Sequence, residues 1–417
     1  MADKFTMLKG GRLIDGNGGD PVEDSVLVIK NDRIDAVGKE GKVGEFPQDA
    51  EVIDVSGKTV MPGLMDMHVH PLGVKSLDPL SWIITSQELR AIRASVDAWR
   101  LIDSGFTTIR DCATPTSLHL KKAVEEGSII GPRIFSCNKI ITQTAGHGDV
   151  AHFLPAAWSY ERGIARVADG VDECRKAARE QLREGADFIK MCTTGGVMSE
   201  KDKPTHTQFS LDEIKAMVEE AHAFGVKAAS HAQGTPGIKN ALLGGVDTIE
   251  HGIFLDDEVI EMMINQGTYL IPTLAIVKAI IEGGTEAGVP QGSLDKAKRV
   301  FEIHRASFKK AYDAGVKVGL GTDYLSDPMS PMGKNAVELK IYVEVGRTPM
   351  EAIVSATKIN AEVVDMGDDL GTLDKGKLAD LIVVDGNPLD DISILCDKAN
   401  ILNVFKGGKQ IPRLNID

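Results

Sequence analysis

The chain has 417 residues, with 47 Lys and Arg against 61 Asp and Glu, so its formal net charge is −14. Hydrophobic residues make up 42% and charged residues 26%, a composition typical of a globular protein that excludes a disordered chain. The acidic balance argues against a nucleic-acid-binding protein, and no apolar run reaches the roughly 18 residues of a membrane-spanning helix.

The start of the chain and the cysteines point to one compartment. Met1–Lys9 lacks the apolar stretch of a secretory signal. The five cysteines form no C-x-x-C pair and are odd in number, as expected of buried free thiols in a reducing compartment. We therefore expect a cytoplasmic protein with no membrane and no nucleic-acid partner.

Both ends of the chain consist of short β-rich runs separated by turn residues. In the first sixty residues these runs are Phe5–Leu8, Ser25–Lys30, Arg33–Val37 and Glu51–Asp54. In the last fifty they are Leu381–Val384, Ile401–Phe405 and Lys409–Ile411. Neither end has enough strands for a sandwich of its own. The simplest solution pairs residues 1–60 with residues 367–417 in one small β-sandwich domain.

Between these ends, apolar β-runs alternate with amphipathic helical stretches. The β-runs are 64–68, 107–111, 133–141, 188–192, 227–231, 248–251, 269–272 and 317–321. Helix starts are marked by capping boxes at Ser210 with Glu213 and at Thr348 with Glu351. Eight strands alternating with helices predict an α/β fold, a (β/α)8 TIM barrel over residues 61–366. A doubly wound open sheet is the alternative, and its dinucleotide glycine fingerprint is missing.

Three connections after strands are long, at residues 71–87, 142–170 and 274–294. Long loops in a compact barrel tend to be functional. Because these three follow strands, we expect them at the C-terminal face, where barrel active sites are built.

Histidines gather at the ends of the β-runs. His68 and His70 form His-x-His at the end of the first run, and strand residues i and i+2 point to the same side. His231, His251 and Asp323 end the fifth, sixth and eighth runs, and in a barrel these ends converge on the axis. Taken singly, a His-x-His often binds nothing and an Asp at a strand end often caps a turn. Four imidazoles and one carboxylate together predict a site for a divalent transition metal.

With these residues in place, the sequence resembles the amidohydrolase superfamily over nearly the whole chain. The matching stretches are VMPGLMDMHVH at 60–70, GFTTIRD at 105–111, HAQG at 231–234, IEHG at 249–252, GTD at 321–323 and GTLDKGKLADLIVV at 371–384. The resemblance implies a split β-sandwich that flanks the barrel, which is the arrangement predicted above from the β-runs.

Lys190 decides how many metals the resemblance implies. It lies in the fourth run before a small-residue turn at 193–196, where a charged lysine is costly to bury. In binuclear amidohydrolases a lysine on this strand reacts with carbon dioxide, and the carbamate bridges two metals. The alternatives are a solvated lysine at the strand end or a simple charge partner.

The resemblance further implies a ligand set and a mechanism. Two divalent ions would share the carbamylated lysine, with ligands His68, His70, Asp323 and Lys190 on one and His231, His251 and Lys190 on the other. Zinc is the expected metal, although such sites also accept manganese, cobalt or iron. A hydroxide shared by the ions would attack the carbonyl, and Asp323 would pass its proton to the leaving nitrogen. The expected reaction is cleavage of an amide or peptide C–N bond.

Several stretches are similar to the prolidase-like and imidazolonepropionase-like branch of the superfamily: RD at 110–111, GHGD at 146–149 and GGVMS at 195–199. This branch includes metal-dependent dipeptidases, carboxypeptidases and hydrolases of N-acyl amino acids. Imidazolonepropionase is mononuclear and lacks the bridging lysine, so Lys190 counts against that activity. Some relatives have a tyrosine that contacts the substrate carboxylate where this chain has Gln233, which argues against recognition of a C-terminal carboxylate.

Gln233 is one of four candidate substrate-binding residues. His147, in the second long connection, is a candidate both for catalysis, by binding the carbonyl oxygen, and for binding a substrate carboxylate; the alternative is a hydrogen bond within the loop. Met198 and Tyr324 lie at loop or strand ends that face the same mouth. The remaining histidines are expected to be solvated, to cap helices or to stay away from the substrate: His119, His152, His206, His222 and His304.

Two classes of function stay open at this point. The first is a metal hydrolase of small amides, a dipeptidase or N-acyl amino acid hydrolase, with hydrolysis of ureas, carbamates or cyclic amides, including xenobiotics, as the alternative. The second is a non-catalytic relative that serves in assembly. Such relatives usually lose metal ligands, whereas every expected ligand is present here. We expect a homo-oligomeric enzyme with a small-molecule substrate.

Overall fold

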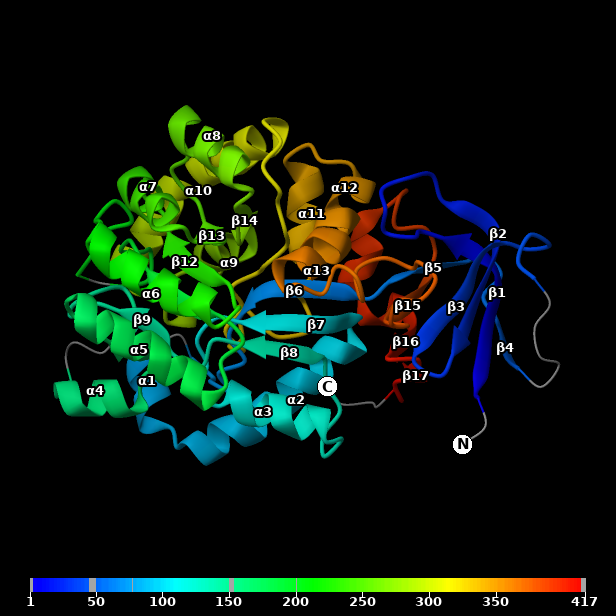
Figure 1. Ribbon diagram of the computed structural model, residues 1–417, viewed down its shortest axis with the longest axis horizontal. Coiled ribbons are helices and arrows are strands. Elements are labelled where there is room, and N and C mark those ends of the chain that lie inside the picture. The colour runs from blue at the N-terminus through cyan, green and yellow to red at the C-terminus, as the bar shows by residue number, and fades with distance from the viewer. Residues whose placement is uncertain (1–2, 45–49, 77, 150–153, 200, 414–417) are drawn as a thin grey trace.

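The computed structural model describes residues 3–44, 50–76, 78–149, 154–199 and 201–413. The two chain ends meet in one eight-stranded sheet of order β17-β16-β15-β5-β1-β2-β3, with β4 beside β1 (Figure 1). Its strands are β1 (Phe5–Leu13), β2 (Val22–Lys30), β3 (Arg33–Lys39), β4 (Glu51–Asp54), β5 (Lys58–Pro62), β15 (Leu381–Asp385), β16 (Ile401–Lys406) and β17 (Lys409–Gln410).

The junction between the two ends is the antiparallel pair β5–β15, in which Val60 lies opposite Val383. Alternate residues of β1 are buried, as expected of a strand with one face on a core. Leu8, Leu27 and Phe405 belong to one apolar cluster beneath the sheet, so residues from both ends build the same small core. A second sheet that would complete a sandwich, and the domain boundaries at 60 and 366, stay predictions.

The rest of the chain is an α/β fold with parallel strands (Figure 1). One sheet has the order β10-β9-β11-β12-β13-β14 and the other the order β6-β7-β8. Their strands are β6 (Leu64–Val69), β7 (Phe106–Asp111), β8 (Arg133–Ser136), β9 (Ile140–Thr142), β10 (Ala165–Val167), β11 (Ile189–Cys192), β12 (Ala228–Ala232), β13 (Thr248–His251) and β14 (Tyr269–Ile271).

The two parallel sheets do not join into one closed ladder over the described residues. Between β14 and β6, the reason is that the predicted eighth strand does not form a continuous strand. Residues 317–324 form only isolated parallel bridges, Leu270 to Val318 and Val69 to Tyr324. They nevertheless lie between β14 and β6, because the Met67 N–H donates to the Leu320 carbonyl at 2.9 Å. The predicted third strand is also divided, into β8 and β9. The parallel α/β fold is therefore observed, and it is consistent with a TIM barrel.

Helices cover the outside of the parallel strands (Figure 1). They are α1 (Pro79–Ile84), α2 (Gln87–Asp103), α3 (Ser117–Glu125), α4 (Ala156–Arg162), α5 (Val171–Glu184), α6 (Leu211–Ala223), α7 (Thr235–Gly244), α8 (Asp257–Gln266), α9 (Leu274–Gly283), α10 (Gln291–Asp313), α11 (Val337–Glu344), α12 (Pro349–Val354) and α13 (Asn360–Val363). Both predicted capping boxes are present, at the starts of α6 and α12. Within the described part of the chain, no helix is long and apolar enough to cross a membrane.

The three long connections are less irregular than the sequence predicts. The first contains α1, the second contains β10 and α4, and the third is largely helical in α9 and the start of α10. The sequence of α9, LAIVKAIIEG, is mostly apolar, and its two charged residues, Lys278 and Glu282, form only a narrow polar stripe. Its residues Ile276, Val277 and Ile280 line a pocket while its other side is packed, which explains this pattern.

Candidate metal-binding active site

The strand ends bring all six predicted ligands to one cavity. β6 and the residue that follows it contribute two of them, β11, β12 and β13 contribute one each, and the bridged segment after β14 contributes the last: His68, His70, Lys190, His231, His251 and Asp323. The convergence follows from parallel strands, whose C-terminal ends all lie at the same face of the fold.

The side chains in this group are close enough to one another to bind the same metal ion. The ring centroids of His68 and His251 are 5.0 Å apart, and those of His231 and His251 are 4.5 Å apart. Asp323 Oδ1 lies 3.0 Å from His70 Nε2 and 3.5 Å from His68 Nε2. One ligand atom each from His68, His251 and Asp323 lies within 4.8 Å of the others, a spacing that suits a single metal ion.

The backbone at two of these positions is unusual. His251 has φ 72° and Asp323 has φ 59°, both in the left-handed region that residues with a Cβ rarely adopt. Asp323 reaches its place because Gly321 precedes it: a Cβ on Gly321 would lie 2.7 Å from the Cβ of His68. Left-handed non-glycine residues of this kind cluster at functional sites.

Three of the imidazoles have one nitrogen fixed by a partner outside the cavity. His68 Nδ1 lies 2.7 Å from Glu250 Oε2, and His231 Nε2 lies 3.1 Å from the Gly195 carbonyl oxygen. His251 Nδ1 lies 2.7 Å from the Thr273 hydroxyl. A carboxylate or carbonyl can only accept, so the bonded nitrogen of His68 and of His231 carries the hydrogen, and the other nitrogen keeps its lone pair for a metal.

Behind His68, Glu250 and Arg110 form a buried ion pair that was not predicted from the sequence. Glu250 accepts from Arg110 Nη2 and from the Thr248 hydroxyl, both at 2.6 Å, in addition to His68. Arg110 also donates from Nε to the Met67 carbonyl at 2.7 Å, so the pair links β7, β13 and β6. The available signal was a charged residue inside each of two apolar strands, where an unpaired charge would be costly.

Burial sets the protonation of the site. It lowers the pKa of His68, His231 and His251 well below the usual value, which leaves neutral imidazoles, the form that binds metals. For Asp323 burial raises the pKa, but the nearby His68 and the hydrogen bond from His70 outweigh it, and the pKa is lowered. The cavity therefore presents neutral imidazoles together with a carboxylate.

The surroundings of Lys190 indicate whether this group of residues fits a metal. It is 1% exposed and makes no hydrogen bond or ion pair with any residue that the structure describes. A lone ammonium among imidazoles is unfavourable there, whereas a carbamate would be an anion among ligands. His70 Nδ1 is also buried without a partner among the described residues. Four imidazoles, one carboxylate and this lysine therefore fit divalent transition metals.

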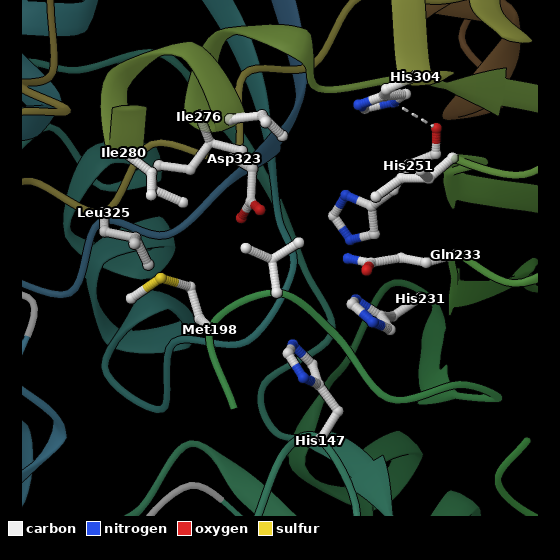
Figure 2. Close-up of a pocket in the computed structure, with 13 residues that line it drawn as sticks. His147, Met198, His231, Gln233, His251, Ile276, Ile280, His304, Asp323 and Leu325 are labelled. Atoms are coloured by element: carbon white, nitrogen blue, oxygen red, sulfur yellow. Dashed lines mark hydrogen bonds between the residues drawn. The ribbon is translucent and has the colours of Figure 1, made fainter. Parts of the chain in front are cut away.

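A second lobe continues from the cavity (Figure 2). The two lobes share His147, Met198, His231, His251, Asp323 and Leu325. We call the second one the aliphatic lobe, because Val197, Ile253, Ile276, Val277 and Ile280 line it. Figure 2 shows the imidazoles of His231 and His251 on one side of the pocket and Ile276, Ile280, Leu325 and Met198 on the other.

The structure places three of the four candidate substrate-binding residues at these lobes and one away from them. His147 and Met198 line both lobes and Gln233 lines the aliphatic lobe. Tyr324 is 5% exposed and is not among the described residues that line either lobe, because residue 323 takes the inward position. His152, one of the histidines expected to stay away from the substrate, lies outside the described residues.

The expectation for His304 is wrong. It is fully buried on α10, lines the aliphatic lobe and donates from Nε2 to the His251 carbonyl at 2.8 Å (Figure 2). Burial lowers the pKa of its imidazole to about 4, so the ring is neutral at pH 7. Helical periodicity places it on the packed face of α10, but the contact with β13 depends on tertiary structure.

Known proteins match this chain over most of its length. The amidohydrolase family model matches residues 59–411. Ochratoxinase from Aspergillus niger is 34% identical over 425 residues, covering 97% of this chain and 86% of that protein. Among solved structures, a prolidase complexed with N-methylphosphonate-L-proline is 37% identical with a TM-score of 0.92, covering 99% of this chain and 100% of that one. A Xaa-Pro dipeptidase with methionine bound in its active site is 36% identical with a TM-score of 0.89, covering 98% and 100%.

These matches confirm the resemblance to the prolidase-like branch and the expectation of an enzyme over that of a non-catalytic relative. The chain belongs to the amidohydrolase family and is a hydrolase that acts on carbon–nitrogen bonds.

Proposed function

We propose that the protein is a binuclear metal-dependent amidohydrolase that cleaves the amide bond of a dipeptide or an N-acyl amino acid with an apolar side chain. The observation that carries this proposal is one cavity in which the six candidate metal ligands lie beside two mostly apolar lobes. The prolidase and dipeptidase structures that this chain resembles support a peptide-like substrate.

Two sets of residues would hold the metals, which we expect to be zinc. The first consists of His68, His70 and Asp323 and the second of His231 and His251, with carbamylated Lys190 shared between them. When bound, the ions would polarise the amide carbonyl and lower the pKa of a water molecule so that it attacks at neutral pH.

Asp323 would move the proton in this reaction. Its carboxylate faces the cavity between the β6 histidines and the aliphatic lobe, and its lowered pKa keeps it ionised and able to accept. It would take a proton from the attacking water and release it to the leaving nitrogen, which must be protonated before the C–N bond breaks. His147, in the wall that the lobes share, would bind the substrate next to the scissile bond.

The two lobes define the flanks of the substrate. On one side of the shared wall lie Trp82, Ala113, Ile140 and Ile164, and on the other the aliphatic lobe. A substrate with its amide at the histidines would therefore place an apolar group in each. Burial of these groups contributes about 25 cal/mol per Å² of apolar surface to the free energy of substrate binding and excludes water from the reaction.

A second candidate is hydrolysis of ureas, carbamates or cyclic amides with apolar substituents. The described residues that line the lobes include no arginine and no lysine other than Lys190. They therefore provide no arginine or further lysine that would pair with a substrate carboxylate. Gln233, at the position where some relatives have a carboxylate-binding tyrosine, also favours a substrate without a carboxylate.

We further propose the setting of this site: a TIM barrel over residues 61–366 inserted into a β-sandwich of residues 1–60 and 367–417, in a cytoplasmic homo-oligomer. The shared β5–β15 sheet supports the insertion, and the bridges made by residues 317–324 support closure of the barrel between β14 and β6.

The test is a hydrolysis screen of protein stripped with a chelator and reloaded with zinc, manganese or cobalt in bicarbonate. Dipeptides and N-acyl amino acids are compared with their carboxamides and with carbamates and ureas that carry the same apolar groups. We expect two metals per chain and the highest kcat/KM for apolar dipeptides or N-acyl amino acids. Activity confined to the carbamates and ureas would establish the second candidate, and no metal binding would refute both.

A further inference from the structure

His147 is held by a polar network on the side away from the cavity. Its Nδ1 lies 2.9 Å from the Ser199 hydroxyl, and its backbone N–H donates to Gln208 Oε1 at 3.0 Å. The carboxylate of Asp202 accepts from Ser199, from Gln208 Nε2 at 3.2 Å and from the Gly196 N–H at 3.0 Å. Asp202 is 7% exposed, so it is a buried acceptor to which the whole network converges.

The chemistry of these groups fixes the direction of every hydrogen bond. A carboxylate only accepts, so the Ser199 hydroxyl donates to Asp202; its other neighbour, the Gly196 carbonyl, is farther away at 3.4 Å. The Ser199 oxygen is then left to accept the hydrogen on His147 Nδ1. Gln208 is oriented in the same way, with its amide nitrogen on Asp202 and its oxygen on the His147 backbone. The bond to Ser199 leaves the other ring nitrogen, Nε2, free to face the two lobes that the His147 side chain lines.

Packing holds the ring in this orientation. The His147 ring stacks on His231 with centroids 4.0 Å apart and planes 18° apart. It also lies directly against Gly196, where a Cβ would come within 2.2 Å of His147 Cε1. From α10, the Lys296 ammonium donates to the carbonyls of Gly196 at 3.1 Å and Asp202 at 2.8 Å, which ties this loop to the helix.

We propose that Asp202 is a positioning residue for His147, which it orients through Ser199 and Gln208 so that Nε2 faces the scissile amide beside His231. Neither Asp202, Ser199 nor Gln208 is among the described residues that line the lobes, so their effect on a substrate passes through His147. The inference rests on the proposed function for its kinetic consequence, but the orientation of His147 does not depend on it.

The kinetic test is a double-mutant cycle on zinc-loaded enzyme. Asp202→Asn puts an amide where three donors point, and should lower kcat/KM by about 10–100-fold, the usual effect of losing an orienting partner. In a His147→Ala background the same change should have almost no further effect, because the residue that it orients is gone. Ser199→Ala should follow Asp202→Asn, and Ser199→Thr, which keeps a hydroxyl, should restore most of the activity.

Asp169→Asn is the matched control. Asp169 holds the same 142–170 connection through Thr144, with bonds of 3.0 and 2.6 Å, but does not contact His147. It should leave kcat/KM within a few-fold of wild type. If Asp202→Asn lowers kcat/KM equally with and without His147, the residue acts on the loop in general and the proposal is refuted.

A second readout is independent of activity. The ¹⁵N chemical shifts of His147 should report hydrogen on Nδ1 in the wild type and a mixture of tautomers in Asp202→Asn. A protein that shows these shifts but hydrolyses no amide would refute the proposed function and keep the positioning role. An unchanged tautomer in Asp202→Asn would refute the positioning role whatever the activity.

Discussion

Glu250→Gln tests the buried support of His68. Glu250 is 0% exposed and accepts from Arg110, Thr248 and His68 at 2.6–2.7 Å. Glutamine keeps the shape but has one accepting oxygen for three donors, and it leaves the Arg110 guanidinium without its counter-charge. Breaking a buried ion pair in this way costs about 3–5 kcal/mol. We therefore expect the free energy of unfolding of the metal-free protein to fall by about 3 kcal/mol, at the lower end because one acceptor remains.

The same substitution should weaken metal binding, because His68 Nδ1 then faces an amide that can no longer hold the ring in one orientation. Loss of such a partner typically costs 10–100-fold in metal affinity, and we expect that range for zinc. Urea denaturation of the metal-free protein measures the first effect and zinc titration against a competing chelator the second.

Glu258→Gln is the control for this experiment, since Glu258 pairs with Lys239 at the surface, where the side chains are 60% and 40% exposed. An exposed pair of this kind contributes about 0–1 kcal/mol, so this variant should unfold and bind zinc like wild type. If Glu250→Gln behaves like the control in both assays, the Arg110–Glu250–His68 network does not support the site.

Four further predictions follow from the site and the fold. Asp323→Asn should fold normally but lower kcat by about 10²–10⁴-fold, the effect of a lost general base; a kcat within a few-fold of wild type at equal metal content would leave Asp323 no role in proton transfer. Lys190→Ala should lose at least one of two metals and most activity, and metal loading of the wild type should depend on bicarbonate. If metal analysis finds two metals in this variant and its rate is that of the wild type, Lys190 does not bridge the metals. A chain of residues 61–366 alone should aggregate, as judged by light scattering, because the core that it shares with Ile382 and Ile401 would be exposed, and a soluble active fragment would contradict this. Burial raises the pKa of Glu338 from 4.5 to about 8; the folded state therefore binds the extra proton, its stability falls as pH rises through that range, and Glu338→Gln should remove this part of the pH dependence of urea denaturation.

The placement of the candidate ligands could be predicted from the sequence because it depends on local rules. A strand has a period of two, so His68 and His70 share a side, and parallel strands end at one face, so His231, His251 and Asp323 approach them. Neither rule needs the details of packing. The shared sheet of the two chain ends was predictable for a similar reason, since too few strands at each end require a partner.

The partners of these residues were not predictable in this way. Glu250 lies 182 residues from His68, and Asp202 and Gln208 meet His147 across more than fifty residues of chain. These hydrogen bonds are selected by tertiary geometry, and in the sequence each partner is an ordinary polar residue. The helix α9 was missed for a different reason, because it is packed on one side and lines a pocket on another, which leaves only a narrow polar stripe to mark its period.

The left-handed backbone at His251 shows how local sequence rules and tertiary contacts together build the site. A non-glycine residue in that conformation costs about 1–3 kcal/mol and persists only where its surroundings fix it. Here His304 donates to the His251 carbonyl, Thr273 holds its ring, and one turn along α10 Ser307 donates to the Ile253 carbonyl at 2.8 Å. The candidate ligand His251 is encoded where a strand ends, whereas the direction of its side chain is set with the help of a helix about fifty residues later. His304 and Ser307, which carry no recognisable motif, are therefore part of the same site as the histidine they support.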